Sequence, residues 1–169
     1  MAIAIVATAK ATNANSYVTL ADAETYLEGR LAVTTWDADT DDNKNRSLRM
    51  STDILDAYGW EGSRTTQAQR LEWPRANTTD RDGWGYSSDT VPRPIKEATY
   101  ELAFALIDGT YEVAPDALEK YDRVKVDVIE VVPRSDYRAG QLPDHIRDIV
   151  SHLLTAGAAS AVSFRTVRT

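Results

Sequence analysis

The apolar residues between positions 95 and 107 recur at the spacing of an α-helix, and this pattern restricts the fold more than any other feature of the chain. One face of the predicted helix carries Ile95, Ala98, Thr99, Leu102, Ala103, Leu106 and Ile107. Pro92 and Pro94 suit its beginning, because the first turn of a helix leaves its N–H groups unbonded in any case. With Asp108-Gly109 as its end, this helix is predicted to be the central and most buried one.

Three further helices are predicted from caps and apolar faces. The first follows the cap Thr19 and places on one face Leu20, Ala23, Leu27 and Leu31. The second begins near Asp39 or Thr40, runs to Tyr58 before Gly59, and carries the stripe Leu48, Ser51, Leu55 and Tyr58, widened by Met50, Ile54 and Ala57. The last runs from about Pro143 to Thr155 on Ile146, Ile149, Val150, Leu153 and Leu154.

A short β segment is predicted between the last two helices. Alternation with polar residues, followed by a shift of phase, marks Val124, Val126, Val128, Ile129 and Val131. Because one strand alone is not stable, its partner must come from elsewhere in the chain or from another subunit. These five residues are therefore a candidate inter-subunit strand.

The fold class follows from these elements. We expect a mainly α protein, a small bundle of about four helices with a long irregular loop (59–91), a short β strand or hairpin (about 121–133) and extended termini. The 169 residues suit a single domain (1–169) with arms at about 1–15 and 157–169.

The composition of the chain excludes or disfavours several classes of function. The absence of cysteine excludes disulfides, thiolate metal sites and a cysteine nucleophile. The formal charge of -7 disfavours generic attraction to phosphate backbones, which depends on Lys and Arg. The apolar residues 1–11 follow no basic region and are too short to cross a bilayer, so we expect no signal peptide, no membrane partner and synthesis in a cytoplasm.

No catalytic or metal-binding pattern emerges. The carboxylates at 37–42 begin like a calcium loop, but Asp42 stands where that loop needs glycine and Leu48 where it needs glutamate. His145 and His152 are seven residues apart, too far for the close pairing of a zinc protease helix. We therefore predict no enzyme activity, no metal and no cofactor.

The loop at 59–91 contains the sequence LEWPR (71–75) and mixes aromatic residues with arginines. One interpretation is a surface for single-stranded nucleic acid, formed by Arg64, Arg70, Arg75, Arg81, Trp60, Trp73, Trp84 and Tyr86. The favoured interpretation is structural: Trp73 fills the helix layer, Pro74 keeps it out of helical geometry, and Arg75 pairs with a carboxylate. A subunit interface is the third alternative. Trp60, Trp73, Pro74 and Arg75 are thus the candidate fold-defining residues.

Four blocks of sequence, taken together, resemble one protein family. They are residues 15–27 (NSYVTLADA, then Tyr26-Leu27), 53–62 (DILD, then Trp60-Glu61-Gly62), 69–75 (QRLEWPR) and 91–103 (VPRPIK, Ala98, Glu101-Leu102-Ala103). Over about residues 13–108 the chain resembles the head-to-tail connector, or adaptor, proteins of tailed bacteriophages. Some members of that family are labelled as DnaT-like single-stranded DNA binding proteins.

The resemblance implies a structural virion protein located in the neck, at the head–tail interface. Such proteins form a homo-oligomeric ring, commonly of twelve copies, between the portal protein and a downstream neck or tail protein. Double-stranded DNA passes through the ring without sequence-specific contact. The alternative function is a single-stranded DNA binding accessory protein of replication.

Overall fold

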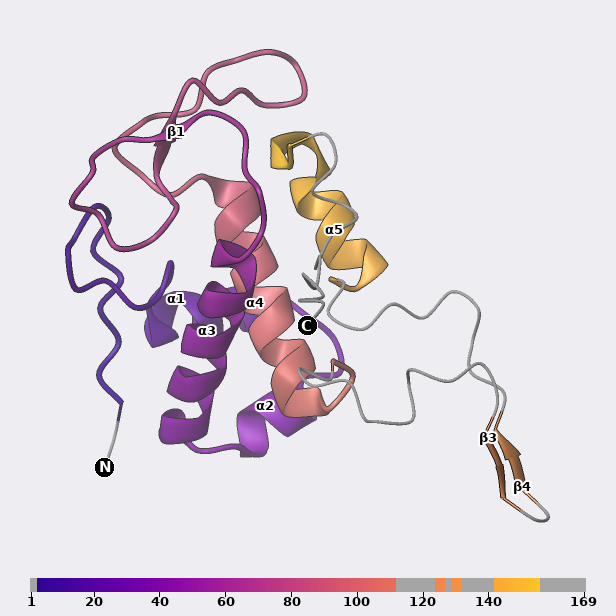
Figure 1. Ribbon diagram of the computed structural model, residues 1–169. Coiled ribbons are helices and arrows are strands. Elements are labelled where there is room, and N and C mark those ends of the chain that lie inside the picture. Colours follow the sequence, from indigo (N-terminus) through magenta and orange to yellow (C-terminus); the bar gives the residue numbers. More distant parts are fainter. Residues whose placement is uncertain (1–2, 112–123, 127–128, 132–141, 156–169) are drawn as a thin grey trace, which may run out of the picture.

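A computed structural model describes residues 3–111, 124–126, 129–131 and 142–155, and within them the protein is mainly α (Figure 1). The helices are α1 (Leu20–Glu28), α2 (Thr34–Ala38), α3 (Asp41–Asp56), α4 (Arg93–Asp108) and α5 (Asp144–Val150), which a 3-10 turn η2 (Ser151–Leu153) follows. The strands are β1 (Ser63–Arg64), β2 (Arg75–Ala76), β3 (Val124–Val126) and β4 (Ile129–Val131). The predicted fold class is confirmed.

Helix α4 is the central helix, as the sequence predicts. It contacts α1, α2, α3 and α5, and α3 and α5 lie on either side of it (Figure 1). The buried apolar core gathers on it from all of these elements and includes Leu27, Trp36, Leu48, Leu55, Ile95, Leu102, Ile146 and Leu153. Gly109 ends α4 with a φ of 71°, a left-handed conformation that favours glycine.

Helix α1 begins as predicted and ends earlier. The Thr19 hydroxyl accepts from the Asp22 N–H and the Asp22 carboxylate accepts from the Thr19 N–H, a reciprocal capping box. The helix stops at Gly29, so the predicted place of Leu31 on its buried face is wrong. Leu31 lies in the following turn and is 92% exposed.

Helix α3 begins where the sequence predicts, but one residue of its predicted apolar stripe, Met50, is exposed. Its cap is Thr40, and Asp41 and Asp42 lie in the first turn, where the helix dipole favours negative charge. Met50 is exposed because it follows the buried Leu48 by two residues and so points to another side of the helix. The short helix α2, which buries Trp36, is not in the prediction.

The last helix is divided into two pieces. Pro143 is the N-cap of α5, and after Val150 the chain tightens into η2. The predicted apolar face holds, since Ile146, Val150 and Leu153 are all buried. A bridge between Leu154 and Trp60 joins the end of this segment to the beginning of the 59–91 loop.

The predicted β segment is a local hairpin. Val124 pairs with Val131 and Val126 with Ile129 in antiparallel register, so the partner strand comes from the same chain. Val128 lies outside the described residues. Whether this hairpin meets another subunit stays a prediction.

Residues 3–18 form neither helix nor strand, and they are tied to the body by hydrogen bonds. The Ile3 N–H donates to the Asp42 carboxylate (3.1 Å), and the Tyr17 N–H donates to the Thr52 hydroxyl (3.2 Å). The Arg70 N–H donates to the Ala11 carbonyl (3.3 Å). The single-domain organisation stays a prediction, and the arm predicted at 157–169 lies outside the described residues.

Candidate functional site

The loop at 59–91 places two of its tryptophans inside the protein. Trp73 is 1% exposed and Trp60 is 4% exposed. Their rings meet edge to face, with centroids 5.7 Å apart. The Trp60 indole N–H donates to the Leu55 carbonyl (3.0 Å) near the end of α3, which fixes the loop to that helix. The peptide bond between Trp73 and Pro74 is cis.

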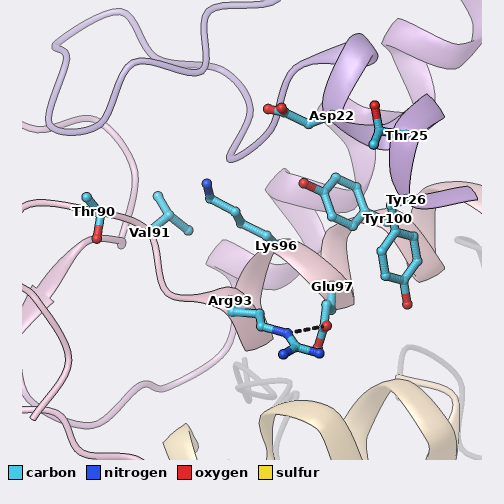
Figure 2. A pocket seen from close by; sticks show the side chains of 9 residues that line it. All are labelled: Asp22, Thr25, Tyr26, Thr90, Val91, Arg93, Lys96, Glu97 and Tyr100. Atoms are coloured by element: carbon cyan, nitrogen blue, oxygen red, sulfur yellow. Dashed lines mark hydrogen bonds and ion pairs between the residues drawn. The ribbon is translucent and has the colours of Figure 1, made fainter.

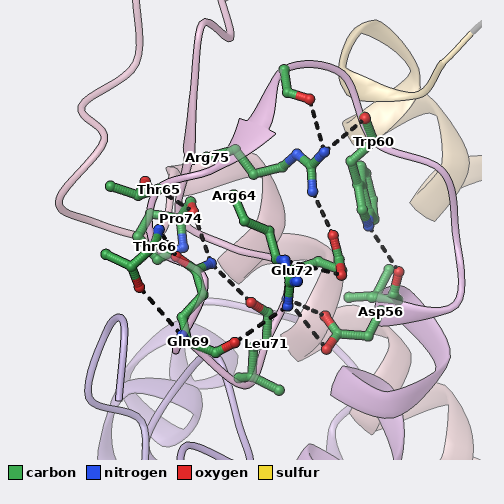
Figure 3. A network of polar contacts seen from close by, with 12 residues as sticks. Asp56, Trp60, Arg64, Thr65, Thr66, Gln69, Leu71, Glu72, Pro74 and Arg75 are labelled. Atoms are coloured by element: carbon green, nitrogen blue, oxygen red, sulfur yellow. Dashed lines mark hydrogen bonds and ion pairs between the residues drawn. The ribbon is translucent and has the colours of Figure 1, made fainter. Parts of the chain in front are cut away.

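Arg75 holds the turn that begins the loop (Figure 3). Its guanidinium donates to three backbone carbonyls, those of Trp60 (3.3 Å), Glu61 (2.8 Å) and Gly62 (2.9 Å). It also pairs with the Glu72 carboxylate at 2.5 Å, while only 9% of the residue is exposed. The predicted ion pair of Arg75 is confirmed. Its hydrogen bonds to three backbone carbonyls show that this arginine stabilises the fold of the loop.

Gln69 and Gly62 complete the loop network. The Gln69 amide donates to the carbonyls of Leu71 (2.9 Å) and Pro74 (3.0 Å), so it spans the LEWPR segment from inside. Gly62 has a φ of 70°, and a Cβ there would lie 2.2 Å from the Ala76 carbonyl oxygen. Both features hold the strand β2 against β1, in register Ser63 to Ala76 and Arg64 to Arg75.

Asp56 joins three segments at the end of α3. Its carboxylate accepts hydrogen bonds from the Tyr17 hydroxyl and from the Glu72 N–H. Burial raises the pKa of the Asp56 carboxyl to about 7, a direction that the negative charge of Glu72 reinforces and the Glu72 N–H opposes. The carboxyl therefore titrates near neutral pH while it connects the N-terminal segment, α3 and the loop.

This carboxyl should make the stability of the protein depend on pH. In the unfolded chain its pKa returns to about 4, so between pH 4 and 7 the folded state binds more protons than the unfolded state. The contribution of Asp56 to the free energy of unfolding therefore falls as pH rises through this window, by at most about 1.4 kcal/mol per pH unit. We expect urea unfolding of Asp56→Asn to show a flatter pH dependence than the parent protein.

Asp53→Asn is the matched control, because Asp53 lies on the same helix with an exposed carboxylate. That variant should keep the pH dependence of the parent. Identical slopes for Asp56→Asn and the parent protein between pH 4 and 7 would show that the Asp56 carboxyl is not the titrating group.

Only part of the surface predicted for nucleic acid lies on the exterior, because Trp60, Trp73 and Arg75 are buried while Arg64, Arg70, Arg81 and Trp84 are exposed. Besides Trp60, Trp73 and Arg75, two further members already have partners. The Arg81 guanidinium donates to the Asp148 carbonyl (2.5 Å), and the Tyr86 hydroxyl bonds to the His152 ring (3.2 Å). The eight residues therefore do not form one surface, and the structural interpretation of the loop is the one that the contacts support.

Trp84 is the one tryptophan of the loop that is exposed, with 76% of its surface accessible. It lies at the tip of a turn that the bridge between Thr79 and Gly85 closes. This exposed aromatic ring remains available for a partner.

Among the described residues, no group of three or more His, Asp or Glu side chains could hold a metal ion. His152 is half-buried against Tyr86, and His145 lies 4.0 Å from the Glu101 carboxylate. In the described part of the chain, no helix is both long enough and apolar enough to cross a membrane.

Sequence reasoning missed the roles of Asp56 and Gln69. Asp56 lies in the stretch DILD at the end of a helical pattern, where a carboxylate is normally solvated. Gln69 begins the QRLEWPR block, which was the only available signal of its importance. Asp56 bonds to segments distant in sequence, whereas Gln69 bonds within its own loop to Thr66, Leu71 and Pro74. The spacing of apolar residues encodes neither arrangement.

The fold and the loop define a small, mainly helical protein whose aromatic-and-arginine loop is a structural element. The chain belongs to the family described as "Putative DnaT-like ssDNA binding protein", whose family model matches residues 1–169. The searches of curated proteins and of solved structures gave no match. The family description names single-stranded DNA binding and says nothing of a phage neck.

Proposed function

We propose that this protein is a structural, non-enzymatic component of the neck of a tailed bacteriophage. In this role copies of the chain form a ring between the portal protein and the tail, and double-stranded DNA passes through the ring. The proposal begins from the sequence resemblance over residues 13–108. The burial of Trp60, Trp73 and Arg75 supports it, because these three residues of the shared blocks hold the fold together and are not accessible to a nucleic acid.

The net charge of the chain is compatible with this role. Binding to DNA backbones requires cations that neutralise phosphates, and this chain has 26 acidic against 19 basic residues. A channel built from such subunits would hold the duplex weakly and leave it free to move. A strongly basic lining would instead retain the DNA.

Phage particles assembled without this protein test the proposal. We expect such particles to lose packaged DNA or to fail to join tails, and we expect the protein to be located at the neck in images of complete particles. Infectious particles that form normally in its absence would exclude the adaptor role.

The second candidate is a single-stranded DNA binding protein of replication, which the family description favours. Among the tryptophans of the loop, Trp84 is the one placed to stack on a base, since Trp60 and Trp73 are inside the protein. Base stacking on an aromatic side chain contributes about 1–3 kcal/mol per base, and binding to a backbone weakens steeply with salt.

Titration with a fluorescent oligonucleotide at low and high salt separates the two functions. A replication protein should bind tightly at low salt, lose affinity in Trp84→Ala and keep most of it in Trp84→Phe, which retains a ring for stacking. For the adaptor we expect weak binding that these substitutions do not change. Tight, Trp84-dependent binding would favour the replication role.

A further inference from the structure

The turn that carries Trp84 is held in one conformation by hydrogen bonds among its own residues. The Asp80 carboxylate accepts from the N–H groups of Asp82 (3.0 Å) and Trp84 (2.8 Å). The Asp80 N–H donates to the Trp84 carbonyl (2.8 Å), and the Gly83 N–H donates to the Asp80 carbonyl (3.1 Å). We call residues 80–85 the Trp84 turn. A large aromatic side chain on a preorganised turn loses little conformational freedom when it binds a partner.

A groove of about 680 Å³ lies between α1 and the first turns of α4 (Figure 2). We call it the α1–α4 groove. One wall is aromatic: the partly exposed Tyr26 ring is stacked on Tyr100, with centroids 4.7 Å apart, and Tyr100 itself is 7% exposed. Val91 adds an apolar side chain to the lining. The volume falls within the range of roughly 300–1,000 Å³ of pockets that enclose small ligands, which leaves room for an indole ring.

Among the described residues, two charged side chains of the groove have no ion-pair partner, Asp22 and Lys96. Glu97 pairs with Arg93 (2.7 Å), and the Asp22 carboxylate belongs to the cap of α1. Lys96 projects into the groove (Figure 2), and within the described residues its ammonium has no hydrogen bond or ion pair. The groove therefore combines an aromatic wall with an unpaired cation.

The Trp84 turn offers the complementary pair of groups. Its aromatic ring is exposed, and the carboxylate of the neighbouring Asp82 has no partner among the residues that the structure describes. An indole suits a wall of tyrosine rings, since aromatic pairs favour offset or edge-to-face contact. An aspartate two residues away suits a lysine at the same site.

We propose that the Trp84 turn of one copy binds in the α1–α4 groove of a second copy, with Trp84 against the Tyr26 and Tyr100 rings and Asp82 paired with Lys96. The occupant is a second copy because this chain itself supplies the aromatic ring and the charge that the groove lacks. When the same two copies do not exchange it reciprocally, a contact between two different surfaces of one chain is heterologous, the type from which rings are built. The inference deepens the adaptor proposal and rests on it for the ring in which the contact would be used.

The absence of cysteine in the chain allows a direct test. Asp82→Cys and Lys96→Cys are made in separate full-length chains, mixed in equal amounts and oxidised mildly, and the products are identified by mass spectrometry. We expect the mixed 82–96 disulfide to dominate over the two symmetric products. It should not form when Trp84→Ala is added to the Asp82→Cys chain. In the matched control, the second chain carries Asp53→Cys instead of Lys96→Cys. Asp53 is an exposed residue of α3 outside the groove.

Sedimentation equilibrium of the full chain gives the second readout. Trp84→Ala and Lys96→Glu should each weaken self-association by roughly tenfold or more, as expected for an anchoring tryptophan and its charged neighbour. The double variant Asp82→Lys/Lys96→Glu should recover it, which a purely structural role of either residue would not predict. An 82–96 product no more abundant than the control, or a chain that stays monomeric at every concentration, would overturn the contact.

The contact and the adaptor role can fail separately. Absence of the 82–96 disulfide would exclude this contact and leave the particle experiment untouched. Normal particles without the protein would exclude the adaptor role, and a cross-link that depends on Trp84 would still establish the contact. A lower yield of the disulfide when an oligonucleotide is present during the oxidation would show that a nucleobase competes with the second copy for the Trp84 turn.

Discussion

Replacing Trp73 by alanine should destabilise the protein by about 3–5 kcal/mol, the usual cost of truncating a fully buried aromatic side chain. The indole is enclosed between the core and the ring of Trp60, so its removal leaves a cavity that the helices close only in part. For a chain of this size each kcal/mol lowers the melting temperature by roughly 2–4 °C. Thermal and urea unfolding followed by circular dichroism would measure the loss.

Two variants sharpen this prediction. Trp84→Ala removes an indole from the same loop where it is exposed, so it should change the unfolding free energy by no more than about 0.5 kcal/mol. Trp73→Phe should cost less than Trp73→Ala, because among the described residues the Trp73 indole N–H has no hydrogen-bond partner to lose. A melting temperature that Trp73→Ala leaves unchanged would place this ring on a surface.

The helices could be predicted because their signals are local. Thr19 and Thr40 act as caps through bonds to residues three positions on, and the apolar face of α4 needs only the period of its own sequence. The prediction extended the first apolar face to Leu31 across Gly29, although the chain leaves the helix at that glycine. Helix α2 has five residues, too few for a periodic pattern to be recognised.

The burial of Trp73 and the ion pair of Arg75 were also predictable, because each is a common use of that residue type. The remaining partners of Arg75 were not, since they are backbone carbonyls and every residue carries one. Asp56 shows the same limit. Its raised pKa depends on the Tyr17 and Glu72 segments that cover it, and neither lies next to it in the sequence.

This difference bears on how an aromatic-and-arginine loop should be interpreted. Composition alone is compatible with base stacking, because the sequence does not show whether a tryptophan is exposed or buried. Only the contacts show that Trp60 and Trp73 pack in the core and that Trp84 alone among the three projects outward. The function of the loop therefore separates into an internal part that holds the fold and a tip that is free to bind.

Replacing Arg75 by alanine should lower the free energy of unfolding by up to about 3–5 kcal/mol, the range for breaking a fully buried ion pair, since Arg75 is buried and its partner Glu72 is one-third exposed. Glu72 would lose its 2.5 Å partner, and the carbonyls of Trp60, Glu61 and Gly62 would lose their donor. We expect the turn at 60–62 to open, which would shift the tryptophan fluorescence of the folded variant to longer wavelength. Urea unfolding and an emission spectrum would measure the two effects.

Two further variants, Arg75→Lys and Arg64→Ala, separate the contribution of the Arg75 charge to stability from that of its hydrogen bonds. Lysine keeps the charge and lacks the planar fork that reaches three carbonyls, so Arg75→Lys should recover only part of the lost stability. Arg64 also faces Glu72, but at 3.9 Å and half exposed, so its removal should cost at most about 1 kcal/mol. If Arg75 were instead a phosphate-binding residue, Arg75→Ala would weaken binding to an oligonucleotide and leave unfolding unchanged. The contacts favour the loss of stability, because Arg75 is 9% exposed and its guanidinium already makes four hydrogen bonds inside the protein.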